Sequence, residues 1–364
     1  MVVKRAFEAI PNFSEGRDQA LLKMLAADRH VVDLHSDADH NRSVLTLVGA
    51  DLSGLSDALF AMVTLATERI DLRRHSGVHP RVGATDVVPF VPLGKAALSD
   101  AVTAALALGD RIWRELGVPV YFYGDAALGR RLADVRAGRV RPDLGGAHHP
   151  TAGAVCVGAR RGLVAFNVAF SGLAMVRARQ IASLMRELPG VQALAFQLPG
   201  DRAQISMNLT RLNETSVPEA YRRACDLAGL RGEPELVGLC PAAAAGPGCD
   251  GGLLEARLAA TAARMAAETA HDRGGDEMAR MAERLSVESR SLAATATDQE
   301  ALLAGAERAA AMMRVLVAAG LSGPELDALL ALSVAGLRGA VIPETAARFH
   351  QRVDLLDTWL ESLC

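Results

Sequence analysis

Hydrophobic and polar positions alternate with two different periods along the first two thirds of the chain. A period of two predicts strands, and a period near 3.6 predicts amphipathic helices. In the first part, the pattern predicts strands at residues 4–10, 31–34, 43–49, 87–91 and 118–123, and helices at 17–27, 55–70 and 99–117. This part is therefore expected to form a mixed layer of strands and helices, followed by a loop-rich segment at 124–153.

The second part has a cleaner pattern. It predicts a strand at 163–168, a helix at 173–188, a hairpin of strands at 192–197 and 203–209, a helix at 216–230 and a strand at 235–239. The second helix begins with Ser216-Val-Pro-Glu219, which reads as a capping box. The order βαββαβ is typical of ferredoxin-like α+β folds, and much of the first part follows the same order.

A change of composition separates the last part of the chain. Residues 241–252 form an Ala-, Gly- and Pro-rich linker, and no strand pattern is evident after it. Four or five helices are expected, with breaks at 274–275, 297 and 320–324 and capping boxes at 297–300 and 322–325. We therefore predict an α+β protein with two ferredoxin-like subdomains, at 1–153 and 154–245, and a helical bundle at 246–364.

Composition narrows the class of protein. Of 364 residues, 50% are hydrophobic and 22% are charged, which excludes a long disordered chain, and the net charge of −3 argues against a nucleic-acid partner. Five scattered cysteines without a C-x-x-C pair indicate reduced thiols. The N-terminal residues show no secretory signal and no apolar stretch is long enough to span a membrane, so a cytoplasmic protein is expected.

The segment PNFSEG at 11–16 lies between the first strand and the first helix. The simplest interpretation is that Ser14 and Glu15 cap that helix. A helix N-terminus also attracts anions, and the amide of Asn12 can both donate and accept a hydrogen bond to a ligand.

The segment DLHSDADHNR at 33–42 is rich in carboxylates and imidazoles. Three interpretations are possible, and we favour a polar turn between two strands. The second is a substrate loop in which the carboxylates hold a cation and Arg42 holds an anion. The third is a metal-binding loop. The metal reading would make the chain a metal-dependent hydrolase that uses His35, Asp37, Asp39 and His40.

His79 is the strongest candidate for proton transfer. His75 and His79 have the spacing of a helical zinc pair, but Gly77 and Pro80 argue against a helix. An imidazole in a Gly- and Pro-rich loop suits general acid/base catalysis, because histidine titrates near neutral pH. The neighbouring Arg81 suits carboxylate binding.

A second loop, at 143–153, contains the glycines that permit close approach of a ligand to the backbone, although an ordinary linker would look the same. The chain contains neither a G-x-S-x-G nucleophile motif nor a G-x-x-x-x-G-K-[ST] phosphate loop. Covalent acyl transfer and ATP use are therefore disfavoured.

Taken together, these segments resemble the formiminotransferase family. The strings, in family order, are PNFSEG (11–16), DHNRSV (39–44), GVHPRVGATDVVPF (77–90), VPVYFYG (118–124), RPDLGG with HPTAG (141–153), GLVAFNV (162–168), QISMNL (204–209) and ELVGLCP (235–241). The resemblance implies transfer of a formimidoyl group from N-formimidoyl-L-glutamate to tetrahydrofolate, the co-substrate, in histidine degradation. It also implies two subdomains facing each other across a groove, and a homodimer.

The resemblance also implies roles for individual residues. The family's catalytic histidine corresponds to His79, and the folate-contacting loop corresponds to Gly145, Gly146, Ala147, His148, His149, Pro150, Thr151, Ala152 and Gly153. Asp39 and Asp86 are our physical candidates for stabilising a cationic formimidoyl group. The other expected substrate or folate contacts, with Arg42 and Arg81 for the anions, are Asn12, His40, Asn41, Gly83 and Asn208.

Three departures from the family pattern keep alternatives open. Val78 stands where animal members have an acidic residue, the loop reads DLGG where an aromatic residue and a proline are common, and the helical tail lacks the Pro-Gly-Gly-Gly-Ser string of the cyclodeaminase domain. The alternatives are a glutamate formyltransferase that uses 5-formyl-tetrahydrofolate and a non-catalytic folate-binding protein. We interpret the helical tail as a supporting or spacer bundle in preference to a cyclodeaminase-like domain.

Overall fold

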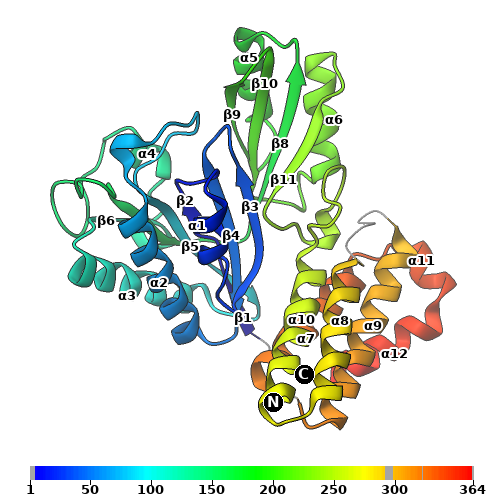
Figure 1. The fold of residues 1–364 in the computed structure, drawn as a ribbon. Helices are drawn as coiled ribbons and strands as arrows, with labels where there is room; N and C mark the ends of the chain where they lie inside the picture. Colours follow the sequence, from blue (N-terminus) through cyan, green and yellow to red (C-terminus); the bar gives the residue numbers. More distant parts are fainter. Residues whose placement is uncertain (1–4, 292–297, 322, 363–364) are drawn as a thin grey trace. The chain divides into compact units, whose positions relative to one another are not determined.

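A computed structural model describes residues 5–291, 298–321 and 323–362 (Figure 1). The chain divides into two compact units. The N-terminal unit is Phe7–Gly162 together with Phe196–Asp201, and the second unit holds the other described residues. The protein is of the α+β class, with mixed β-structure and a helical C-terminal region, as the sequence predicts.

A seven-stranded mixed sheet forms the centre of the N-terminal unit. The strand order is β1-β4-β2-β5-β7-β6, with β3 paired to β4 and a further pairing of β1 with β5. Strands β5, β6 and β7 run parallel, whereas β4 pairs antiparallel with β1, β2 and β3. The strands are β1 (Arg5–Ala9), β2 (Asn12–Phe13), β3 (Val31–Asp37), β4 (Arg42–Gly49), β5 (Thr85–Gly94), β6 (Val120–Gly124) and β7 (Val155–Ala159).

Two hydrophobic clusters hold this sheet, one on each face. Val88 belongs to the larger cluster, which includes Leu59 of α2 and Ala105 of α3. Its neighbour Val87 belongs to a smaller cluster with Val135 of α4, because successive strand residues point to opposite faces. The helices are α1 (Gln19–Leu25), α2 (Leu52–Arg69), α3 (Leu98–Leu116) and α4 (Leu132–Arg136); the pattern did not predict α4 or the two-residue strand β2.

The second unit contains a four-stranded sheet of order β11-β8-β10-β9. Strand β8 pairs antiparallel with β10 and with β11, and the chain order is βαββαβ, as predicted. The elements are β8 (Val164–Ser171), α5 (Met175–Met185), β9 (Val191–Leu198), β10 (Arg202–Leu209), α6 (Val217–Ala228) and β11 (Glu233–Val237).

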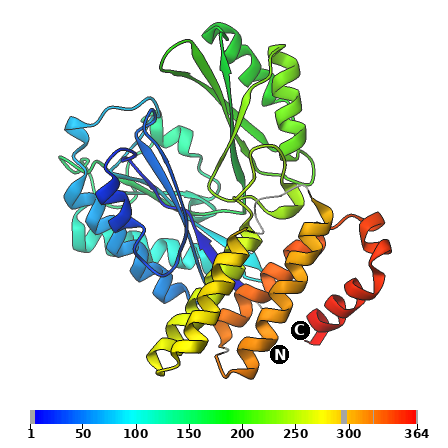
Figure 2. The same cartoon turned by 45° about the vertical axis from the view of Figure 1, so that its right-hand side comes forward.

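In the described residues after β11, the structure has six α-helices, where four or five were expected. Helix α7 packs against α8 and α10, and α10 packs against α9 (Figure 2). The helices are α7 (Leu254–Asp272), α8 (Asp276–Ser291), α9 (Gln299–Ala318), α10 (Pro324–Gly339), α11 (Pro343–Arg348) and α12 (His350–Ser362). In the part of the chain that the structure describes, no helix is both long and apolar enough to cross a membrane.

Several capping predictions were wrong. Asp18 caps α1 by accepting hydrogen bonds from Ala20 and Leu21, so Ser14 and Glu15 are not its caps. Ser216 precedes α6 without a side-chain capping bond. Asp298 caps α9, one residue later than predicted; the expected caps Thr297 and Ser322 lie outside the described residues.

Candidate active site

Asn41 joins three of the segments that the sequence analysis singled out. Its Oδ1 accepts a hydrogen bond from the backbone of Gly16 at 2.9 Å, and its Nδ2 donates to the carbonyl of Ser76 at 3.0 Å. Asn41 lies at the end of the β3–β4 turn with φ of 45°, a left-handed conformation that asparagine tolerates better than most residues. The turn thus fixes the loop that carries His79.

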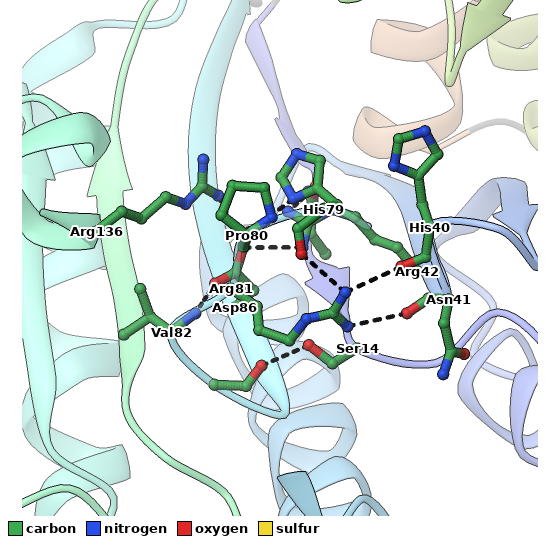
Figure 3. Close-up of polar contacts among 12 residues, drawn as sticks. Ser14, His40, Asn41, Arg42, His79, Pro80, Arg81, Val82, Asp86 and Arg136 are labelled. Carbon is green, nitrogen blue, oxygen red and sulfur yellow. Dashed lines mark hydrogen bonds and ion pairs between the residues drawn. The ribbon is translucent and has the colours of Figure 1, made fainter. Parts of the chain in front are cut away.

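Arg81 holds the same loop through backbone carbonyls. Its guanidinium donates to the carbonyl oxygens of His40 at 3.0 Å, His79 at 2.8 Å and Asn41 at 3.2 Å (Figure 3). Gly77 lets the loop approach this closely, because a Cβ there would lie 2.3 Å from the carbonyl oxygen of His40. Arg81 therefore stabilises the conformation of the loop. An anion that binds Arg81, as the sequence predicts, would compete with these three carbonyl oxygens for its N–H groups.

The imidazole of His79 is half-buried and has a defined hydrogen bond. Nδ1 lies 2.6 Å from the carbonyl oxygen of Pro80. A carbonyl only accepts hydrogen bonds, so Nδ1 carries the proton and Nε2 keeps its lone pair in the neutral ring. This arrangement presents a base on the Nε2 side.

Two other rings lie beside His79. The centroid of His40 is 5.9 Å away and that of Phe196 is 5.6 Å away, and these two rings are themselves 5.3 Å apart. Phe196 comes from the Phe196–Asp201 segment that belongs to the N-terminal unit. Sequence reasoning missed it, because a single aromatic residue in a distant hairpin carries no local signal of this contact.

A buried charge cluster lies next to this loop. Asp86 is fully buried, and its Oδ2 is 2.8 Å from Arg42 Nη1 and 2.8 Å from Arg136 Nη2. Its Oδ1 accepts a hydrogen bond from the backbone of Val82 at 2.6 Å. Arg42 also donates to Asn12 Oδ1 at 2.8 Å. Asp86 and Arg42 thus bind each other inside the N-terminal unit, and a contact of Asp86 with a ligand stays a prediction.

This cluster sets the protonation of its neighbourhood. Burial, followed by the charges of Arg42 and Arg136, lowers the pKa of His79 to about 3. Burial raises the pKa of Asp86, but the same two arginines outweigh it and bring the value to about 2. Burial and then Arg42 lower the pKa of Arg81 to about 10. At neutral pH, His79 is therefore uncharged and Asp86 is a carboxylate.

The predicted folate loop lies alongside the segment that follows His79. The backbone of Ala84 donates to the carbonyl of Ala152 at 2.8 Å, and Ala154 donates to Val82 at 3.1 Å. Gly153 has φ of +71° and a Cβ there would meet the Val82 carbonyl at 2.4 Å, so this close approach requires glycine. The two segments are neighbours in space although about 70 residues apart in sequence.

The two loop histidines differ in their partners. His148 Nε2 lies 2.9 Å from the hydroxyl of Tyr121. His149 Nδ1 accepts from the backbone of Ala152 at 3.1 Å, which assigns its proton to Nε2 in the neutral ring. Residues 145–148 and Pro150 are exposed, whereas Ala152 and Gly153 are buried.

The remaining candidates fall in different places. Ser14 donates to the carbonyl of Gly83 at 2.7 Å, and Asn12 Nδ2 donates to Ile10 at 2.8 Å, so both side chains fix backbone. Asp37 accepts from the backbone of His40 at 2.7 Å, which confirms the polar turn at 37–40. Asn208 lies in β10 of the second unit.

The positions of the four candidate metal ligands do not support a metal site in the turn. His35 and Asp37 are in β3, and Asp39 and His40 are in the turn that follows. Among the residues that the structure describes, no group of three or more His, Cys, Asp or Glu side chains is placed to hold a metal ion.

Comparisons with known proteins point in one direction. Residues 6–160 match the model of the formiminotransferase domain, N-terminal subdomain. The chain is 40% identical over 273 residues to a glutamate formimidoyltransferase of Streptococcus pyogenes, covering 65% of this chain and 89% of the relative. It is 38% identical over 266 residues to the glutamate formimidoyltransferase of Thermoplasma acidophilum, covering 64% and 88%. The formimidoyltransferase-cyclodeaminase of Sus scrofa is 36% identical over 273 residues, and the match spans 64% of this chain and 50% of that protein.

Proposed function

Because the chain belongs to the formiminotransferase family, we propose that it is a glutamate formimidoyltransferase. In this reaction the formimidoyl group moves from N-formimidoyl-L-glutamate to tetrahydrofolate. The similarity to two glutamate formimidoyltransferases, each matched over nearly nine tenths of its length, carries the proposal.

His79 is the proposed general acid/base. Nitrogen-5 of tetrahydrofolate attacks the formimidoyl carbon, and Nε2 of His79 accepts the proton that this nitrogen loses. The tetrahedral intermediate then collapses with cleavage of the bond to the glutamate nitrogen, which takes the proton back from Nε2. The hydrogen bond from Nδ1 to Pro80 supports this role, because it leaves Nε2 as the basic atom.

The charge cluster prepares the base but does not touch the reacting atoms in this proposal. Burial, followed by the charges of Arg42 and Arg136, disfavours the imidazolium form, so His79 starts the reaction neutral. Substrate carboxylates that approach the arginines would offset their charge and make Nε2 more basic when the complex forms. Asp39 remains the carboxylate proposed for the cationic formimidoyl group.

The folate-binding assignments are also proposals. We place tetrahydrofolate against Gly145–Gly153 and near Asn12, His40, Asn41 and Gly83, and we keep Asn208 as a contact from the second unit. The hydrogen bonds that join the loop to residues 82–84 support this, because they tie the loop to the His79 segment. Two ferredoxin-like subdomains, a cytoplasmic homodimer and a spacer role for the tail complete the proposal.

A direct assay tests the function. The purified chain is incubated with N-formimidoyl-L-glutamate and tetrahydrofolate, and the product is read as the methenyl chromophore that forms on acidification. Reactions lacking the chain or either substrate are the controls. Product that depends on all three components supports the proposal. Transfer from 5-formyl-tetrahydrofolate to glutamate alone would assign the formyl reaction instead, and folate binding without turnover would assign a binding protein.

A further inference from the structure

Asp86 carries one negative charge and contacts two positive ones. Each arginine, Arg42 and Arg136, lies 2.8 Å from the same oxygen, Oδ2. Among the described residues, Asp86 is the one carboxylate that pairs with either arginine. The side chains of Arg42 and Asp86 are 8% and 0% exposed, and that of Arg136 is 21% exposed. The cluster therefore keeps an excess charge of +1 where solvent screens it weakly.

Arg136 reaches this cluster from a separate element. It is the last residue of α4, whose Val135 packs with Val87, Tyr121 and Cys156 on one face of the sheet. In the view of Figure 3, Arg136 and the ring of His79 lie on either side of Pro80. The sequence contains five arginines between residues 130 and 141, and nothing in their spacing distinguishes Arg136. Only the fold identifies it.

We infer that Arg136 is a positioning residue for His79: its guanidinium supplies the unbalanced positive charge of the cluster and, together with burial and Arg42, keeps the neighbouring imidazole in its neutral form. The inference rests on the proposed role of His79 as a base. Arg136 acts through its charge on Asp86 and His79, without contact to a substrate. Replacing it with a neutral residue would leave a balanced Arg42–Asp86 pair and remove one of the charges that oppose protonation.

Other charged and titratable groups face His79 and enter the same balance. They come from the β3–β4 turn, from β4, from its own loop, from β5 and from α4; Phe196 adds an apolar face. The groups are His40, Arg42, Arg81, Asp86 and Arg136. Arg42 is also tied to Asn12, and Arg81 to three carbonyl oxygens, so substitution of either would move backbone as well as charge. Arg136 allows the charge to be tested with less disturbance.

The test follows the His79 ring directly by NMR. The Cε1–H signal is assigned by its loss in His79→Gln and is followed without substrates from pH 8 down to pH 3, with circular dichroism at each pH to show that the chain is folded, because the pKa of His79 lies near 3. Wild type is compared with Arg136→Gln, Arg136→Met and Arg136→Lys. Arg139→Gln is the matched control, because Arg139 is an exposed arginine just after α4 that pairs with Asp134. Since no substrate is present, the result does not depend on whether the chain transfers a formimidoyl group.

The expected result distinguishes loss of the positive charge at residue 136 from a change in the shape of its side chain. In the two neutral variants, protonation of His79 should set in at a pH about one unit higher than in wild type, and Arg136→Lys and Arg139→Gln should match wild type. In the transfer assay, the acid limb of kcat/KM should move to higher pH by the same amount in the neutral variants. Coincident His79 titration curves for wild type and a folded Arg136→Gln or Arg136→Met would overturn the inference, and so would a wild-type midpoint near 6.5. If Arg136→Gln does not fold, Arg136→Met provides the neutral variant for the comparison.

Discussion

The Nδ1 atom of His79 and the carbonyl oxygen of Pro80 lie 2.6 Å apart, so the backbone of the next residue fixes the tautomer of the imidazole. Pro80 suits this task because it has no backbone N–H that could compete for a partner. Arg81 then holds the His79 carbonyl at 2.8 Å. Three consecutive residues, His79, Pro80 and Arg81, therefore fix the orientation of one ring.

The pH dependence of kcat/KM follows from the low pKa of His79. A base is active when it is unprotonated, and the folded pKa of about 3 lies below the ordinary value of 6.5. The base form therefore persists as the pH falls, and kcat/KM should stay flat from pH 8 to about 5 once the ionisation of each substrate, titrated alone, has been subtracted. An acid limb with its midpoint near 6.5 would contradict this assignment.

Asp86→Asn should destabilise the N-terminal unit. The substitution leaves the buried guanidinium of Arg42 and the partly buried one of Arg136 without a counter-charge, and removal of one partner of a buried pair costs about 3–5 kcal/mol. Urea unfolding at pH 7.5 measures the loss. Asp134→Asn is a close control, because Asp134 also contacts two arginines, Arg131 and Arg139, but both arginines are exposed. Equal stability of the two variants would refute the structural role of Asp86.

Asn41→Ala should loosen the His79 loop. It removes the hydrogen bonds to Gly16 and Ser76, each of which contributes about 1 kcal/mol, and it places alanine at a positive φ for about 1 kcal/mol more. We expect a loss of about 2–3 kcal/mol in unfolding free energy and a lower kcat. Asn213→Ala, at an exposed asparagine, is the control. A wild-type kcat in Asn41→Ala would show that the hydrogen bonds of Asn41 do not orient His79.

Glu255 gives a prediction for the helical region. Its carboxylate is buried, accepts a hydrogen bond from the backbone of Ala242 at 2.9 Å, and has a pKa raised by burial to about 7. Between pH 4.5 and 7 the folded state binds more protons than the unfolded state, so stability falls as the pH rises through this window. Glu255→Gln removes this loss. The greatest gain in unfolding free energy expected at pH 8 is about 3 kcal/mol.

Thermal unfolding at pH 5 and pH 8 checks the prediction for Glu255. The gain in Tm of Glu255→Gln over wild type should be larger at pH 8 than at pH 5, because the wild-type carboxyl is protonated at the lower pH. Glu268→Gln, on an exposed position of the same helix, should show no such trend. A gain that is the same at both pH values would mean that the titration of Glu255 does not affect folding.

The sequence predicted most strands and helices, because their hydrophobic periods are long and clear. It did not predict β2 or α4, which have two and five residues and offer too few positions for a period. Helix caps were placed wrongly where several polar residues compete, as Ser14, Glu15 and Asp18 do before α1. The cap depends on which side chain reaches the free N–H groups, and spacing alone does not decide that.

The candidate site was predicted in composition but not in geometry. His79, Arg81 and Asp86 were singled out, yet the sequence did not show that His79 and Arg81 bind backbone carbonyls or that Asp86 pairs with both Arg42 and Arg136. The sequence could not show that Asp86 is fully buried or that Phe196 reaches His79. Charge compensation and ring contacts between distant segments are tertiary properties, and no local pattern encodes them.

The most direct test of the account is formimidoyl transfer to tetrahydrofolate by wild type and His79→Ala, measured side by side. His271→Ala, at an exposed histidine of α7, serves as the control, and matching thermal unfolding shows that the variants are folded. Loss of a general acid/base should lower kcat by about a hundred- to ten-thousand-fold, with the control unchanged. Equal turnover by wild type and His79→Ala would contradict the central claim that His79 moves the proton.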